Sequence, residues 1–121
     1  MTYLDGELSL QEIQSLKDSK ISTIEEDDTA RLSGHLTSSG KVFLHMKVKG
    51  KFTKSMLFEW RVHFLDILDG FKAAGKDAVY SLIPEWDEKA IKFNVAMGFR
   101  PIGEVYAQDG SGGSWVLKRD I

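Results

Sequence analysis

Hydrophobic residues recur at steps of three and four through the segment KFTKSMLFEWRVHFLDILDGFKAAG, residues 51–75. The recurring positions are Leu57, Trp60, Phe64, Leu68 and Phe71. Residues three or four apart share one face of an α-helix, so they can be buried together while the opposite face meets water. The spacing therefore predicts a long amphipathic helix near the middle of the chain.

The pattern before this helix has the period of a β-strand. Ala30 to Leu36 and Lys41 to Val48 are both strand-like, and the TSSG between them supplies the Ser and Gly typical of a tight reversal. We expect a β-hairpin. One face of its second arm should be buried and the other partly polar, which makes the polar face a candidate wall of a site. The alternating positions are Leu44, Met46 and Val48 against His45, Lys47 and Lys49.

The pattern after the long helix continues with a short apolar run and a second hairpin. Asp77 to Ile83 reads DAVYSLI, which suits a buried parallel strand reached by a helical crossover, so residues 41–83 form a predicted βαβ unit. The segments RPIGEVYA and GSWVLKR flank the Gly-rich QDGSGG near the C-terminus. We expect them to form an antiparallel hairpin.

Two shorter helices are predicted from their caps. Ser9 precedes LQEIQSLKD, whose Leu10, Ile13 and Leu16 have helical spacing, and Glu12 stands where a capping box places it.

The acidic EEDD at residues 25–28 is expected to be a solvated connection, because nothing nearby supplies the other ligands of a cation site.

The second of these helices should begin near Asp87, a good N-cap residue, and end at Gly98. Gly98 can adopt the left-handed conformation that closes a helix, after which Phe99 folds back on the preceding turns. The residues expected along its buried face are Trp86, Ala90, Phe93 and Met97.

Composition narrows the classes of protein that remain. A chain of 121 residues is long enough for one core, and we expect residues 1–121 to form a single domain. A formal charge of −2 disfavours binding to nucleic acid. The absence of cysteine excludes disulfides, thiolate nucleophiles and thiolate zinc sites and suits a cytoplasmic protein. The N-terminal segment has no leader pattern, and no apolar run is long enough for a membrane span.

The order of these elements resembles the GNAT superfamily of acyl-CoA N-acyltransferases. The residues that carry the resemblance are AIKFNVAMGF, Ala90 to Phe99, where the family typically reads A-i-x-f-Y-x-x-x-G-F. The resemblance covers Ala30 to Ile121, and the part before it is shorter than is usual for the family. It implies a single-domain α/β (α+β) GNAT-like fold, in which a mixed central sheet carries antiparallel N-terminal and C-terminal hairpins, a βαβ core and flanking helices.

The resemblance also implies a site for acetyl-CoA. In such proteins the strand matching Lys41 to Val48 splays from the one matching Asp77 to Ile83, and the pantetheine arm lies in the gap. Backbone N–H groups near Met46 and Val48 would stabilise the oxyanion. The loop VKGKFTKSML and the start of the following helix would take the pyrophosphate.

This loop departs from the family pattern, which is close to [RQ]-x-x-G-x-[GA]. Only Gly50 is kept, and Phe52, Thr53 and Lys54 stand where glycines are expected. Phosphate could still be held by the charges and hydroxyls of Lys51, Thr53, Lys54 and Ser55, although a basic helix start is also a common solvated surface.

The residues expected to move protons are altered as well. Asn94 stands where the family often has a tyrosine that protonates the departing thiolate, and an amide is not an acid. Asp87, at a position where the family commonly has Asn, is expected to cap its helix. His45 is the preferred general base, with Glu85 and Glu104 as alternatives. His35 and His63 are expected to be partly buried or surface histidines, since no spacing resembles a metal site.

Two functions are consistent with these observations. The first is an acetyl-CoA-dependent N-acetyltransferase acting on a small-molecule or peptide amine. The second is a catalytically reduced protein of binding or assembly, similar to the small GNAT-like proteins of tailed phages, which also have poor phosphate loops. An apolar surface patch of Phe52, Phe58 and Trp115 would favour the second function. An open slot beside Val48 would favour the enzyme.

Overall fold

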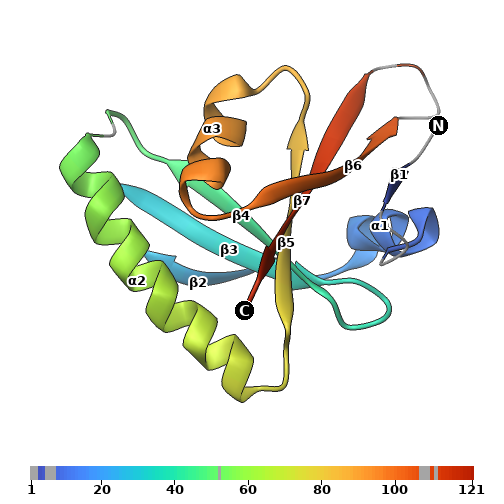
Figure 1. Ribbon diagram of the computed structural model, residues 1–121, viewed down its shortest axis with the longest axis horizontal. Helices are drawn as coiled ribbons and strands as arrows, with labels where there is room; N and C mark the ends of the chain where they lie inside the picture. The colour runs from blue at the N-terminus through green and yellow to red at the C-terminus, as the bar shows by residue number, and fades with distance from the viewer. Residues whose placement is uncertain (1–2, 5–7, 52, 107–109, 111) are drawn as a thin grey trace.

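The computed structural model describes residues 3–4, 8–51, 53–106, 110 and 112–121. Figure 1 shows a twisted sheet with a long helix along one side. The elements in chain order are β1 (Tyr3–Leu4), α1 (Leu10–Ser15), the 3-10 helix η1 (Leu16–Asp18), β2 (Ser22–Glu26), β3 (Ala30–Leu36), β4 (Val42–Val48), α2 (Lys54–Ala73), β5 (Ala78–Pro84), α3 (Glu88–Ala96), β6 (Arg100–Tyr106) and β7 (Gly113–Asp120).

The strands form one seven-stranded sheet in the order β1-β6-β7-β5-β4-β3-β2. Among the strands of the described residues only the pair β4–β5 is parallel, and α2 is the crossover that connects these two strands. All other neighbours are antiparallel, including the hairpins β3–β4 and β6–β7. The predicted mixed sheet, its two hairpins and its βαβ unit are therefore confirmed.

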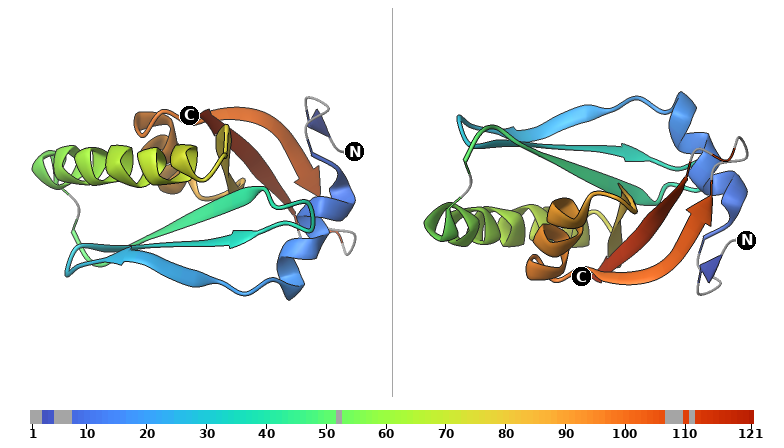
Figure 2. Two further views of the ribbon diagram at one scale, coloured as in Figure 1. Left: turned by 90° about the horizontal axis from the view of Figure 1, so that it is seen from below. Right: turned by 90° about the horizontal axis from the view of Figure 1, so that it is seen from above.

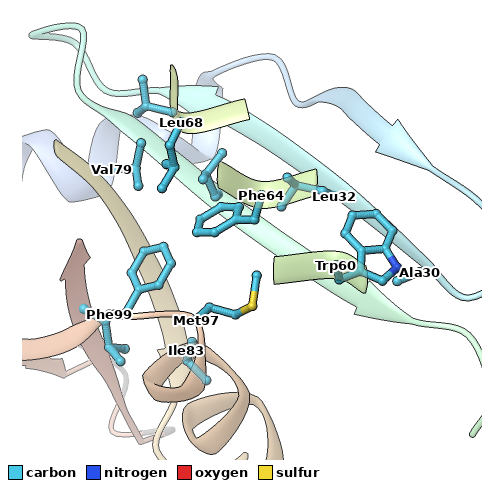
Figure 3. Packing of buried hydrophobic residues seen from close by; sticks show 12 residues of the cluster. Ala30, Leu32, Trp60, Phe64, Leu68, Val79, Ile83, Met97 and Phe99 are labelled. Carbon is cyan, nitrogen blue, oxygen red and sulfur yellow. The ribbon is translucent and has the colours of Figure 1, made fainter. Parts of the chain in front are cut away.

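Helices α2 and α3 lie on one face of the sheet, and α1 lies on the other (Figure 2). The larger core cluster fills the space under α2, where Trp60, Phe64 and Leu68 are buried as their spacing predicts. Figure 3 shows these side chains directed at the sheet, with Met97 and Phe99 arriving from the end of α3. A second cluster, which includes Ile13, Leu16 and Phe43, fills the face under α1.

The register of the hairpin β3–β4 divides the side chains of β4 between these two faces. Leu32 faces Met46 and Ser33 faces His45 across the pair. Val42, Leu44 and Met46 pack with the cluster under α2, whereas Phe43 belongs to the cluster under α1. His45 shares the face of Phe43 because side chains two apart lie on one side of a strand. The predicted alternation is confirmed for Leu44 and Met46, whereas Val48, which was expected on the buried face, is exposed.

Helix α3 ends as the sequence predicts. Gly98 has a φ of 96°, its N–H donates to Val95, and the N–H of Phe99 donates to the carbonyl of Asn94 at 3.0 Å. This pair of bonds is a Schellman motif, which satisfies carbonyls that a helix end leaves open. At the other end Asp87 caps the helix, since its Oδ1 accepts from the N–H of Ala90.

Two predictions about local structure are wrong. Trp86 is 78% exposed, because it precedes the N-cap and so does not follow the helical period of Ala90, Phe93 and Met97. The acidic run is not only a connection, since Glu25 and Glu26 belong to β2, an edge strand whose residues are all exposed.

None of the helices in the described part of the chain combines the length and the apolar character of a membrane span.

Candidate functional site

Strands β4 and β5 separate after a short stretch of pairing. Only two rungs join them, Val42 with Val79 and Phe43 with Tyr80. Beyond Phe43, β4 continues to Val48 along β3, while β5 continues to Pro84 along β7. Figure 2 shows the two halves of the sheet diverging from this point. The splayed pair expected from the resemblance is therefore present, and it opens a gap in the sheet beside Met46 and Val48.

The backbone of β4 directs hydrogen-bonding groups into this gap. Lys49 donates to Thr29 at 2.7 Å and Thr37 donates to Lys41 at 2.9 Å, so the odd-numbered residues of β4 bond to β3. In an antiparallel pair the alternate residues point their N–H and C=O groups the other way. Met46 and Val48 thus direct their N–H groups toward the side from which β5 has departed.

An apolar cleft lies at the gap on the side of α2 and α3. It holds about 260 Å³ of unfilled space, part of it open to solvent. Asn94 adds a polar group to this lining, and its Nδ2 donates to the carbonyl of Ala90 at 2.8 Å. This bond fixes the amide against its own helix, so Asn94 stays in the cleft without an acidic proton. The lining residues are Leu32, Leu44, Met46, Phe64, Phe93, Asn94, Met97 and Phe99.

The predicted phosphate loop leads into the start of α2. Gly50 has a φ of 82°, and apart from its chain neighbours no atom of the described residues lies within 4 Å of the position where a Cβ would stand. Thr53 is the N-cap of α2: its Oγ1 accepts from the N–H of Met56, and its own N–H donates to the sulfur of Met56. The next two residues, Lys54 and Ser55, have no helical partner for their N–H groups.

The side chains of Lys51, Lys54 and Ser55 are exposed around this helix start. Phe52, which the sequence places in the same loop, lies outside the described residues. The structure thus brings positive charge and open N–H groups together at one end of the gap.

Two arginines that sequence reasoning missed line a groove between α2 and α3. The groove holds about 340 Å³ of open space, and Arg61 and Arg119 contribute to its walls with Gly98. Arg119 donates to the carbonyl of Met97 at 2.9 Å and lies over the ring of Phe64 at 5.6 Å. The alternation of β7 carried a signal for Arg119, because Trp115 and Leu117 on the same face both pack against the core.

On the opposite face of β4, His45 begins a chain of hydrogen bonds that runs through His35 to Ser19. Its Nε2 lies 2.8 Å from the Nε2 of His35, and the Nδ1 of His35 lies 2.7 Å from the hydroxyl of Ser19. His35 is buried, as is the Phe43 beside it. Burial is the main cause that lowers the pKa of both imidazoles, and the neighbouring charge of His35 lowers the pKa of His45 further.

The alternative bases, Glu85 and Glu104, gather elsewhere. Both act on Tyr106, whose pKa is raised first by its hydrogen bond to Glu104 and also by the charges of both carboxylates. Glu85 is anchored through its backbone N–H, which donates to Gly113 at 3.0 Å. His63 packs edge-on against Trp60 at 6.0 Å. Among the described residues no three acidic or histidine side chains form a group that could hold a metal ion.

The expected apolar surface patch does not form from the described members of its set. Phe58 is 67% exposed on α2. Trp115 instead packs against the core cluster from β7.

Solved structures that share this fold include acetyltransferases. An acetyltransferase assigned to the GNAT family from Bordetella pertussis has a TM-score of 0.58 and 12% identity, over 84% of this chain and 66% of that chain. The ribosomal-protein-S18-alanine N-acetyltransferase of Escherichia coli has a TM-score of 0.56 and 13% identity, over 85% of this chain and 69% of that chain. A protein described as a phosphinothricin N-acetyltransferase has the same TM-score and identity, 0.56 and 13%, over 87% of this chain and 73% of that chain.

By sequence alone, the chain matches no protein-family profile and no curated protein. At these identities the structural likeness establishes the fold, and the chain has the GNAT fold. It spans about two thirds of the length of the Bordetella pertussis neighbour.

Proposed function

We propose that this chain is an N-acyltransferase that takes an acetyl group from acetyl-CoA and passes it to an amine. The observation that carries the proposal is the gap between β4 and β5, into which Met46 and Val48 direct their N–H groups. The fold neighbours support it, because their names describe N-acetyltransferases acting on a ribosomal-protein alanine and on phosphinothricin. A small-molecule or peptide amine is the corresponding acceptor here, and a cytoplasmic setting suits the cysteine-free composition.

The residues around the gap fit the cofactor in three parts. The N–H groups of β4 and the apolar lining suit the amide groups and alkyl parts of a pantetheine arm. The N–H groups of Lys54 and Ser55, with the charges of Lys51 and Lys54, suit a pyrophosphate. Arg61 and Arg119 add positive charge in the separate groove between α2 and α3.

The chemistry assigned to the chain follows from these positions. Bound acetyl-CoA would supply the acetyl group as an activated thioester, so that one C–N bond forms as one C–S bond breaks. The N–H groups of Met46 and Val48 would stabilise negative charge on the acyl oxygen. His45 would accept the proton that the amine gives up, at the same gap but on the α1 face of β4. Asn94 cannot protonate the leaving sulfur, so water would supply that proton.

Binding of acetyl-CoA tests the proposal directly. At about a hundred times its dissociation constant, acetyl-CoA should add about 2.7 kcal/mol to the free energy of unfolding, read as a rise in melting temperature and as calorimetric heat. The double variant Lys51→Ala/Lys54→Ala should show a smaller shift. Lys17→Ala/Lys20→Ala is the matched control, because it removes the same charge from exposed residues beside α1.

A second candidate is a non-catalytic binding or assembly protein on the same fold, to which the similarity with GNAT-like proteins of tailed phages belongs. The observation in its favour is the exposed row Phe58, Val62 and Leu65, which lies along one side of α2. If millimolar acetyl-CoA produces no calorimetric heat and no shift in melting temperature, the enzyme is rejected and this candidate remains.

A further inference from the structure

The donor and the acceptor of each hydrogen bond between Ser19, His35 and His45 can be assigned. The hydroxyl of Ser19 donates its single proton to the carbonyl of Leu16 at 2.9 Å, so the same oxygen must accept from the Nδ1–H of His35 at 2.7 Å. A neutral His35 that is protonated at Nδ1 offers a lone pair at Nε2. The 2.8 Å contact between the two imidazoles then requires that His45 donates from Nε2.

The consequence concerns the other nitrogen of His45. A neutral His45 that is protonated at Nε2 has a lone pair at Nδ1, and this atom has no hydrogen-bond partner among the described residues. Among the described residues, the only buried side-chain nitrogen or oxygen without a hydrogen-bond partner is Nε1 of Trp60. Nδ1 of His45 has no partner among them either, so it is not a buried atom. Nδ1 of His45 therefore remains accessible to solvent, at a residue just beyond the last rung between β4 and β5.

We infer that Ser19 and His35 are positioning residues that hold His45 in the Nε2–H tautomer, so that its Nδ1 can take the proton of an acceptor amine. The inference rests on the proposed function for the identity of the proton donor, whereas the tautomers follow from the geometry alone. In the transfer, the amine loses one proton and His45 becomes an imidazolium whose Nε2–H still donates to neutral His35. The proton then leaves from Nδ1 to water, and His45 returns to its starting tautomer.

The surroundings favour neutral imidazoles at rest. Burial lowers the pKa of both histidines, and of the surrounding groups only His35 acts on the pKa of His45 through its charge. Glu26, which could otherwise oppose this effect, is engaged by Lys49. The other titratable or charged groups on the elements around the pair are Glu12 of α1, Lys17 and Asp18 of η1, Glu25 of β2, Arg31 of β3, Lys47 of β4 and Tyr80 of β5.

Nitrogen-15 NMR of the imidazoles at pH 8 tests the tautomers without any cofactor. We expect His35 to be protonated at Nδ1 and His45 at Nε2. Ser19→Ala removes the acceptor for His35, so both tautomer ratios should move toward the opposite pattern, whereas Ser19→Thr keeps a hydroxyl and should keep the wild-type pattern. The opposite pattern in the wild-type protein, or no change in Ser19→Ala, would overturn the inference.

The rate of acetyl transfer to a small amine tests the role of these tautomers. His45→Gln should lower kcat/KM by about 10²–10⁴-fold, the range of a lost general base. Ser19→Ala should lower kcat by a smaller factor, move the acidic limb of the pH profile and leave the KM for acetyl-CoA unchanged, and Ser19→Thr should restore both the rate and the profile. A rate unaffected by His45→Gln would overturn the assigned role.

The two proposals fail in different ways. If the proposed function is wrong, neither the wild-type protein nor the variants bind acetyl-CoA, while the NMR tautomers are unaffected. If the positioning of His45 is wrong, acetyl-CoA still binds and the tautomers or the pH profile do not respond to Ser19→Ala.

Discussion

Phe64 of α2 and Phe99 after α3 stack with their ring centroids 5.8 Å apart and their planes inclined by 29°. This contact joins the crossover helix to the end of the helix that covers the gap, and Figure 3 shows Met97 beside it. Both rings are buried, with Phe99 only 5% exposed. The cleft and the groove between α2 and α3 share Phe64 as a wall, so the pair also shapes the candidate site.

Phe99→Ala should lower the free energy of unfolding by about 3–5 kcal/mol, the usual loss for a buried ring that leaves a cavity. Urea denaturation measures this loss. Phe58→Ala is the matched control, because that ring is 67% exposed and its removal should change stability by no more than about 0.5 kcal/mol. A loss under about 1 kcal/mol for Phe99→Ala would contradict the packing described here.

Gly98→Ala should destabilise the protein more than Gly75→Ala. Both glycines have a left-handed φ, 96° and 88°, so both substitutions carry the same backbone cost of about 1–2 kcal/mol. A Cβ at Gly98 would also stand 3.1 Å from Nε of Arg119, whereas around Gly75 no described residue other than its chain neighbours lies within 4 Å of such a Cβ. The difference between the two variants in urea denaturation isolates the displacement of Arg119, and equal losses would mean that Arg119 moves aside freely.

The elements that the sequence predicts well are those whose signals are local. The end of α3 needs only Gly98 and its neighbours, because the Schellman motif is built from residues within one turn. The buried face of α2 follows from the spacing of Trp60, Phe64 and Leu68. Strand β2 was missed because its residues are all exposed, so an edge strand of this kind shows no alternation of apolar and polar residues.

The candidate site is harder to predict because it joins elements that are distant in sequence. His35 and His45 are diagonal neighbours in the hairpin. Their proximity could have been predicted from the sequence, because the TSSG turn sets the register of the two strands. Ser19 carried no such signal, since its contact with His35 depends on how η1 packs against the sheet. The groove arginines likewise meet only after α2 and β7 have packed.

Stability should fall as the pH drops below about 6.5, the ordinary pKa of histidine. Burial lowers the pKa of His35 and His45 in the folded protein, so the unfolded chain binds protons more readily just below that pH. The stability that these two histidines contribute is complete above about pH 6.5. It is lost as the pH falls toward their lowered pKa values in the folded protein. Urea midpoints at pH 7.5, 6.5 and 5.5 measure this trend before carboxylates begin to titrate.

The double variant His35→Gln/His45→Gln should flatten the trend over the same pH range. His63→Gln serves as the control, since His63 is exposed on α2 and lies outside the pair. An equally steep fall in the double variant would show that other groups cause it.

Asn94→Tyr tests whether the cleft lacks a general acid that can protonate the departing thiolate. Asn94 lines the cleft from α3, and its Nδ2 is engaged by the carbonyl of Ala90. A phenol there could protonate a departing thiolate, which an amide cannot do, so turnover of a suitable amine should rise by at most about 10²–10⁴-fold. Asn94→Phe fills the same space without a hydroxyl and should give no such rise. A rise in both variants would trace the effect to packing in the cleft, and no rise in either would mean that water already protonates the leaving sulfur fast enough.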